Sequence, residues 1–158
     1  MIFNIDLQRF RSHDHPSLAT GLVTLATART AAGAYDAALP LFERALAIQE
    51  RALGPEHPNV ANTLAQLGRL LLAAGRPDDA LPRLVRAVTS LDAYPALQSA
   101  DYRAHFDLAQ ALVATHGDRV RAYAAATKAR DAWRSAGAAW ARDLAALETW
   151  LAVQAPAN

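Results

Sequence analysis

One short stretch of the sequence gathers metal-ligating side chains, namely His13, Asp14 and His15. Imidazole and carboxylate groups bind zinc, but a zinc site takes three or four ligands that a surrounding shell of hydrogen bonds orients. His15 is followed by proline, and the same pair recurs 42 residues later at His57, where no second histidine stands nearby. A turn shared by both copies explains these histidines better, so we expect no metal site.

The sequence carries no recognisable catalytic motif. The adjacent Asp78 and Asp79 resemble a carboxylate pair, but neighbours on a helix point in different directions. The GxSxG, HExxH and Walker patterns are absent, and there is no cysteine to act as a nucleophile. His105 falls in a predicted helix, and His116 falls at a helix end, where the dipole favours histidine. We therefore expect a protein that is not an enzyme and needs no cofactor.

Charge and hydropathy exclude two further classes of partner. The formal net charge is +1, and the basic residues between Arg119 and Arg142 are diluted by Asp131. A nucleic-acid-binding surface would carry a denser positive stripe. No apolar run approaches the roughly 20 residues that a transmembrane helix requires. The expected protein binds no nucleic acid, spans no membrane and lies in the cytoplasm.

The composition favours helices. Of the 158 residues, 53% are hydrophobic, and Ala and Leu together make up more than a third of the chain. Both are strong helix formers, whereas the β-branched and aromatic residues that favour strands are sparse. The length fits one domain with a core of its own. We expect an all-α fold and exclude a β-sandwich, a barrel or a parallel sheet.

The sequence repeats itself at a spacing of 42 residues. The first two copies match at Leu22 and Leu64, Leu25 and Leu67, Ala38 and Ala80, Phe42 and Leu84, and Ala45 and Ala87. A weaker third copy, which needs about one extra residue in its central turn, carries Leu108, Ala109, Leu112, Gly117, Asp118, Ala122 and Ala129. Self-similarity at a fixed period indicates stacked supersecondary units.

Each copy reads as helix, turn, helix. The first helix of copy one runs from about residue 16 to residue 32, and Gly33 ends it, as glycine often does after a helix. Asp36, Asp78 and Asp118 are the predicted N-caps of the second helices. Pro40 and its counterpart in copy two then fall in the first turn, where the missing N–H costs little.

Small residues recur where paired helices must come close together. They are Ala26 and Gly68, Ala38 and Ala80, and Ala45 and Ala87. Larger residues fill the spaces between, namely Leu22, Leu25 and Phe42 in copy one and Leu64, Leu67 and Leu84 in copy two. Alternating small and large residues at helical spacing lets antiparallel helices interdigitate.

This series of residues resembles the tetratricopeptide repeat (TPR), and the 42-residue spacing resembles its kinesin-light-chain-like subclass. The resemblance implies a right-handed α-solenoid of about three TPR hairpins followed by a C-terminal capping helix. The corresponding ranges are 1–11 for the end of a partial repeat helix, 12–53, 54–95 and 96–135 for three TPRs, of which the third is degenerate, 136–154 for the capping helix and 155–158 for a tail.

The last helix is expected over residues 138–154. Trp140, Leu144, Leu147 and Leu151 form one apolar stripe along it. The outer face of a terminal repeat must be polar, and Arg142, Asp143 and Glu148 could supply that polarity. Trp133, Trp140 and Trp150 are interpreted as packing residues, with ligand stacking as the alternative.

A polar face on the first helix of each copy is the candidate binding site. It comprises Thr20, Thr24, Thr27, Asn62, Gln66, Arg69, Arg103, Asp107 and Gln110. In TPR arrays this face lines the concave groove that receives extended peptides or partner helices. A purely solvating face would be richer in Lys and Glu, whereas Arg suits bidentate capture of carboxylates.

Three hypotheses about function follow from this resemblance. The first is a non-catalytic protein–protein interaction scaffold that binds a peptide or partner helix in the groove. The second is an accessory segment of a larger signalling protein, because the end of the chain loosely resembles the C-terminal regions of some bacterial Ser/Thr protein kinases. The third is self-association, in which the half-repeat formed by residues 1–11 pairs with another copy.

Overall fold

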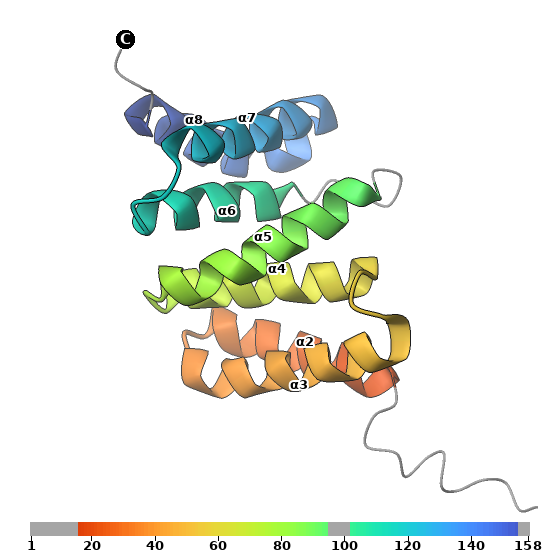
Figure 1. Cartoon of the computed structure of the whole chain (residues 1–158). Coiled ribbons are helices and arrows are strands. Elements are labelled where there is room, and N and C mark those ends of the chain that lie inside the picture. Colours follow the sequence, from red (N-terminus) through yellow and green to blue (C-terminus); the bar gives the residue numbers. More distant parts are fainter. Residues whose placement is uncertain (1–15, 95–101, 155–158) are drawn as a thin grey trace, which may run out of the picture.

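A computed structural model describes residues 16–94 and 102–154 of the chain. Within these residues the regular secondary structure is entirely helical, with short turns between the helices (Figure 1). The elements are α2 (Pro16–Ala31), α3 (Tyr35–Leu53), α4 (Pro58–Ala73), α5 (Pro77–Ala93), α6 (Arg103–Ala114), α7 (Arg119–Ala136), the 3-10 turn η2 (Ala138–Trp140) and α8 (Ala141–Gln154). The predicted partial helix over 1–11, the residues around His13 and the tail over 155–158 lie outside the described residues.

The helices form antiparallel hairpins that stack on one another. The most extensive contacts join α2 to α3, α4 to α5 and α6 to α7, and smaller contacts join α3 to α4 and α5 to α6. Figure 1 shows these hairpins in succession from α2 and α3 (orange) to α7 and α8 (blue). The predicted all-α solenoid of three hairpins and a C-terminal helix is confirmed.

The small residues lie where the helices of a hairpin meet. Ala26, Ala38 and Ala80 are completely buried. A Cβ atom added to Gly68 would lie 2.5 Å from Cγ of Leu84, closer than side-chain carbons approach one another. Leu84 is buried over this glycine, as the alternation of small and large residues predicts.

The N-cap prediction is right for Asp118 and wrong for Asp36 and Asp78. The Asp118 carboxylate accepts a hydrogen bond from the backbone N–H of Arg121 at 2.9 Å. The N-cap positions of α3 and α5 are instead Ala34 and Arg76, neither of which makes a side-chain cap hydrogen bond. Asp36 and Asp78 lie inside the first turn, where a carboxylate still interacts favourably with the helix dipole.

The turn between the helices explains this difference. In copy one Gly33 has a φ of 76°, and the N–H of Ala34 bonds to the carbonyl of Arg29 at 2.9 Å, which is a Schellman turn. The residue that closes this turn is itself the N-cap of α3. In copy three Gly117 closes the equivalent turn, and the extra residue Asp118 then becomes the cap.

The two prolines lie two residues deeper in their helices than the predicted caps imply. Pro40 and Pro82 are each the sixth residue of their helix, because both helices start earlier than the predicted caps imply. Proline cannot donate a backbone hydrogen bond, so a carbonyl four residues earlier loses its helical partner. Both prolines are exposed, and water can solvate the carbonyl on that side of the helix.

Leu25 does not pack as the repeat predicts. It is 45% exposed, whereas its counterpart Leu67 is 1% exposed. Leu67 lies on α4, which packs against α3 of the preceding hairpin. Among the described residues no helix precedes α2, so nothing covers Leu25 in the same way.

The C-terminal helix packs through the expected stripe. Leu147 and Leu151 are buried, while Trp140 and Leu144 are half-buried against the same core. Gly137, with a φ of 84°, separates this region from α7, and α8 begins at Ala141, three residues later than predicted. None of the helices among the described residues is both long and apolar enough to cross a membrane.

Two of the three residues predicted to make the outer face of α8 polar also form ion pairs with neighbouring helices. Asp143 pairs with Arg103 of α6, and Glu148 pairs with Arg134 of α7. Arg142 is exposed, and the side chains of Asp143 and Glu148 remain 35% and 41% exposed. The acidic groups turn toward neighbouring helices because each finds an arginine there.

The packing interpretation of the tryptophans is confirmed. The Trp133 ring is stacked on that of Trp140, with a centroid separation of 5.5 Å and an interplanar angle of 2°. The Phe106 ring makes T-shaped contacts with those of Trp133 and Trp150, at centroid separations of 6.1 Å and 5.7 Å. These aromatic contacts join α6, α7 and α8 into one core.

Replacing the buried alanine of a hairpin with leucine tests this packing. Ala38→Leu and Ala80→Leu should each lower the free energy of unfolding by about 1–3 kcal/mol, because the extra carbons have no space. Ala47→Leu, on the exposed side of α3, is the matched control and should change it little. Thermal or urea unfolding measures all three, and unchanged stability in both buried variants would refute the assigned interface.

Candidate functional site

The nine predicted groove residues lie on α2, α4 and α6, the first helices of the three hairpins. We call these residues the polar row. Side-chain contacts link them across neighbouring first helices: Thr27 to Gln66, and Arg69 to Asp107. The three first helices therefore bring these members of the predicted set together.

The α2 end of the polar row is uncharged. Oγ1 of Thr27 lies 2.8 Å from Oε1 of Gln66 on α4 and 2.8 Å from the carbonyl oxygen of Val23, and its single proton bonds to one of the two. Thr24 donates to the carbonyl of Thr20 at 3.0 Å, a bond that satisfies its hydroxyl proton and leaves oxygen lone pairs available. Thr20, Thr24, Thr27 and the neighbouring Asn62 of α4 are exposed. This end of the row presents hydrogen-bonding groups without charge.

The middle of the polar row holds a buried carboxylate. Asp107 on α6 is 2% exposed, and its Oδ2 atom accepts a hydrogen bond from Nε of Arg69 at 2.9 Å. Nε of Arg103 lies 3.7 Å from Oδ1 of the same side chain. A buried charge is tolerated only when it is paired, and here two guanidinium groups supply that pairing. Asp107 therefore orients the arginines and has almost no surface that a partner could touch.

The row continues onto α8 through a residue that sequence reasoning assigned elsewhere. Asp143 accepts a hydrogen bond from Nη1 of Arg103, so α8 takes the place of a fourth first helix. The sequence separation of the contacting residues could have revealed the role of Asp143. Thr27 and Gln66 are 39 residues apart, Arg69 and Asp107 are 38 apart, and Arg103 and Asp143 are 40 apart.

The charges of the row are balanced within the chain. Arg69 and Arg103 face Asp107 and Asp143, and both arginine side chains remain about one third exposed. Gln110, the last predicted member, is half-buried on α6. The row is thus a nearly neutral surface whose exposed parts are hydroxyls, amides and the outer edges of two guanidinium groups.

A second polar cluster lies on the other side of α6. His105 is 3% exposed, and its Nε2 atom lies 3.0 Å from Oδ1 of Asp92 on α5. Nζ of Lys128 on α7 donates to the same carboxylate oxygen at 2.5 Å. Nδ1 of His105 is buried without a hydrogen-bond partner. These groups tie the second hairpin to the third.

The environment of this cluster shifts two pKa values downward. Burial lowers the pKa of His105, and the charge of Lys128 adds to this effect, while Asp92 opposes it. Burial alone would raise the pKa of Asp92, but the hydrogen bond from Lys128 and the charges of His105 and Lys128 outweigh it. The favoured state near neutral pH is a neutral histidine beside an ionised aspartate.

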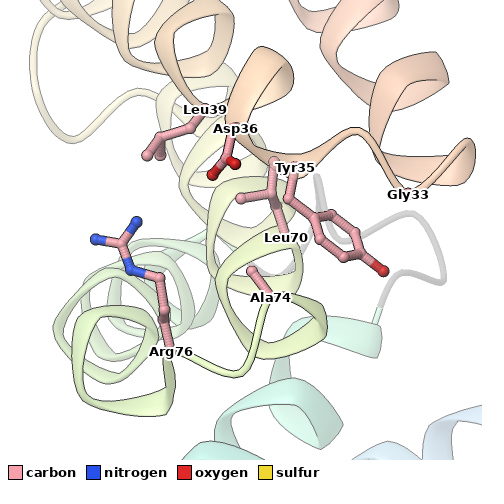
Figure 2. A pocket seen from close by; sticks show the side chains of 7 residues that line it. All are labelled: Gly33, Tyr35, Asp36, Leu39, Leu70, Ala74 and Arg76. Carbon is pink, nitrogen blue, oxygen red and sulfur yellow. The ribbon is translucent and has the colours of Figure 1, made fainter.

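A cavity of about 240 Å³ lies at the turns between helices (Figure 2). It is lined by Gly33, Tyr35, Asp36, Leu39, Leu70, Ala74 and Arg76. The Arg76 guanidinium is already paired with Asp79 at 2.7 Å. Sites for small molecules generally enclose about 300–1,000 Å³, so this open cavity is small for one. Among the described residues no group of three or more His, Asp or Glu side chains could hold a metal ion.

Comparisons with known proteins agree with this geometry. Residues 17–93 match the model of the tetratricopeptide repeat. This part of the chain therefore carries tetratricopeptide repeats, which generally act as non-catalytic protein–protein interaction modules. No match was found among curated protein sequences.

Two similar solved structures are of a Podosopora anserina protein described as a kinesin light chain with nearly identical TPR-like repeats. The first has 23% identity and a TM-score of 0.73, over 89% of this chain and 67% of that one. The second, a substituted form, has 23% identity and a TM-score of 0.72, over 89% and 66%. This chain thus spans about two thirds of their length. At this identity the likeness shows the fold, and the suggested kinase context stays a prediction.

Removing the buried histidine should change how stability depends on pH. The folded-state pKa of His105 lies below its ordinary value of about 6.5, so the unfolded chain binds the proton more readily. The stability contributed by neutral His105 is therefore complete above about pH 6.5 and is lost as the pH falls toward the folded pKa. In His105→Gln the decrease in melting temperature between about pH 7.5 and 5.5 should be smaller than in the native chain.

The exposed His116→Gln is the matched control and should keep the native decrease. Asp92 contributes little in this window, because its lowered pKa makes it lose stability only below about pH 4. Equal decreases in the native chain and in His105→Gln would contradict the assigned role.

Proposed function

We propose that the chain is a non-catalytic scaffold that binds a peptide or a partner helix along the polar row. The observation that supports this proposal is the continuity of the row across four helices, from the threonines of α2 to Asp143 of α8. The match of residues 17–93 to the tetratricopeptide repeat supports it independently, since such repeats generally bind other proteins. In this proposal the row lines the concave groove of the solenoid.

The chemistry of the row favours recognition of main-chain groups. An extended peptide presents N–H and C=O groups that need partners when they leave water. The exposed Thr20 and Asn62 can donate and accept such bonds, and Thr24 can accept them, without the cost of removing a charge from water. Peptide carboxylates would contact the outer edges of Arg69 and Arg103, which already hold internal carboxylates. Affinity for an acidic side chain should therefore be modest.

The internal pairing also decides which substitutions are informative. Arg69→Ala would remove a partner of the buried Asp107, so a loss of binding could reflect a loss of folding. Thr24→Ala and Asn62→Ala remove exposed groups and leave the buried ion pairs intact. The double variant Thr24→Ala with Asn62→Ala therefore tests the surface and spares the core.

Selection of peptides from a display library on the folded chain would supply the binding probe. The dissociation constant of a selected peptide should rise about tenfold in Thr24→Ala with Asn62→Ala, because two hydrogen bonds are lost. Titration calorimetry or fluorescence anisotropy measures the change, and circular dichroism verifies folding.

The control variant, Glu43→Ala with Arg44→Ala, removes exposed groups from α3, outside the row. It should leave the dissociation constant unchanged. Peptides that bind the control and the row variant equally would show that recognition takes place on another face.

A further inference from the structure

The cavity between the first two hairpins is separate from the polar row. One wall is formed by the turn before α3 and the first residues of α3, and the other by the end of α4 and the turn after it (Figure 2). None of its lining residues belongs to the polar row. Its volume of about 240 Å³ is below that of most small-molecule sites, and it suits a single side chain of a partner.

Part of the cavity lining is apolar. Leu39 of α3 and Leu70 and Ala74 from the end of α4 contribute these carbons. Leu70 is 1% exposed and is therefore fixed in the core, while Leu39 and Ala74 are half-buried. An occupant that covers such surface gains free energy by removing it from water, so the lining favours an aliphatic group.

Asp36 is a charged group of this cavity that has no partner within the described part of the chain. Its side chain is exposed, and no hydrogen bond or ion pair among the described residues engages its carboxylate. In Figure 2 the carboxylate points to the side of the cavity on which Leu39 and Arg76 lie, while the Tyr35 ring extends the opposite way. A cation that enters the cavity would therefore find an acceptor next to apolar surface.

Arg76, the basic residue of the cavity, already has a partner. Its Nε and Nη2 atoms lie 2.8 Å and 2.7 Å from Oδ2 of Asp79. A carboxylate that entered the cavity would compete with Asp79 for this guanidinium group, whereas an ammonium group would meet Asp36 and displace no side chain. The three side chains contribute two negative charges and one positive charge, so the cavity favours a cation over an anion.

We propose that this cavity binds a lysine side chain of a peptide or protein partner. The aliphatic stem of the lysine lies on Leu39, Leu70 and Ala74, and its ammonium group pairs with Asp36. Lysine suits the cavity better than arginine, because its apolar stem is longer and its compact ammonium group needs less space beside Arg76 than a planar guanidinium group.

The next junction between hairpins carries different residues at the equivalent positions. Gly117 closes the turn after α6 as Arg76 closes the turn after α4, each with an N–H bond to a carbonyl five residues earlier. Thr115 is the C-cap of α6, where Ala74 is the C-cap of α4. The combination of apolar lining and charged groups therefore belongs to the junction of the first two hairpins.

An NMR titration of the folded chain with the methylamide of Nα-acetyl-lysine tests the proposal without a known partner. The norleucine derivative, which has the same aliphatic stem and no charge, is the comparison ligand. The lysine derivative should shift the backbone N–H signals of Gly33, Leu39 and Ala74. It should bind about fivefold more tightly than the norleucine derivative, because it adds one ion pair at the surface.

Two substitutions separate the charge of the cavity from its apolar lining. Asp36→Asn should make the two ligands bind equally, because it removes the charge and keeps the lining. Asp78→Asn is the matched control, since it removes an exposed carboxylate at the same position of α5, outside the cavity, and it should keep the native preference. Ala74→Leu should weaken both ligands about tenfold, because its added carbons fill the cavity. Circular dichroism verifies that each variant is folded.

Three outcomes would overturn the proposal. Unchanged signals at the cavity residues with about 50 mM ligand, well above a millimolar dissociation constant, would refute the site. Equal affinity of the two ligands for the native chain would show an apolar cavity that does not recognise a cation. An equal loss of both ligands in Asp36→Asn would assign a structural role to that residue.

Failure of the polar row as a binding surface gives a different result. The variant Thr24→Ala with Asn62→Ala leaves the cavity lining intact, so it should bind the lysine derivative as the native chain does. A weaker affinity of this variant for the lysine derivative would show that the ligand occupies the polar row, which would also contradict the proposal.

Discussion

The close approach of two helices within each hairpin is the constraint on which the rest of the structure depends. At Gly68 there is no space for even one additional carbon, because Leu84 occupies it. Ala26 and Ala38 play the same part in the first hairpin, and both are fully buried. Once hairpins of this shape stack, their first helices lie next to each other, and the polar row follows from that stacking.

Burying a charged group of the polar row costs free energy, and the ion pairs within the row offset that cost. Removing the Asp107 carboxylate from water is unfavourable, and the nearby guanidinium groups of Arg69 and Arg103 compensate for it. The pair of Arg69 and Asp107 joins the second hairpin to the third, and the pair of Arg103 and Asp143 joins the third hairpin to α8. Ion pairs of this kind are sensitive to geometry, so they favour one register of the stack over others.

Most of the architecture could be predicted from the sequence, because the residues that pack within one hairpin recur 42 positions later in the next hairpin. What could not be predicted depends on single residues at the turns and ends. One additional residue in the third turn lets Asp118 cap its helix, whereas Asp36 and Asp78 do not. Asp143 joins the polar row because Arg103 lies opposite it, a contact between helices 40 residues apart. The repeat pattern predicts burial for a leucine that has a hairpin on both sides. Leu25 is exposed because it lies in the first helix of the described stack.

The same pairing that aligns the hairpins also shapes what the row can recognise. An acidic partner that approached Arg69 would compete with Asp107, which is held at 2.9 Å and cannot move into water without leaving its buried position. A main-chain amide requires no such exchange, because Thr24 and Asn62 have free hydrogen-bonding capacity at the surface. Under the proposed function, stability and recognition are therefore divided along the row: its charged α4, α6 and α8 portion holds the repeats in register, and its uncharged α2 and α4 portion is the part proposed to meet a partner.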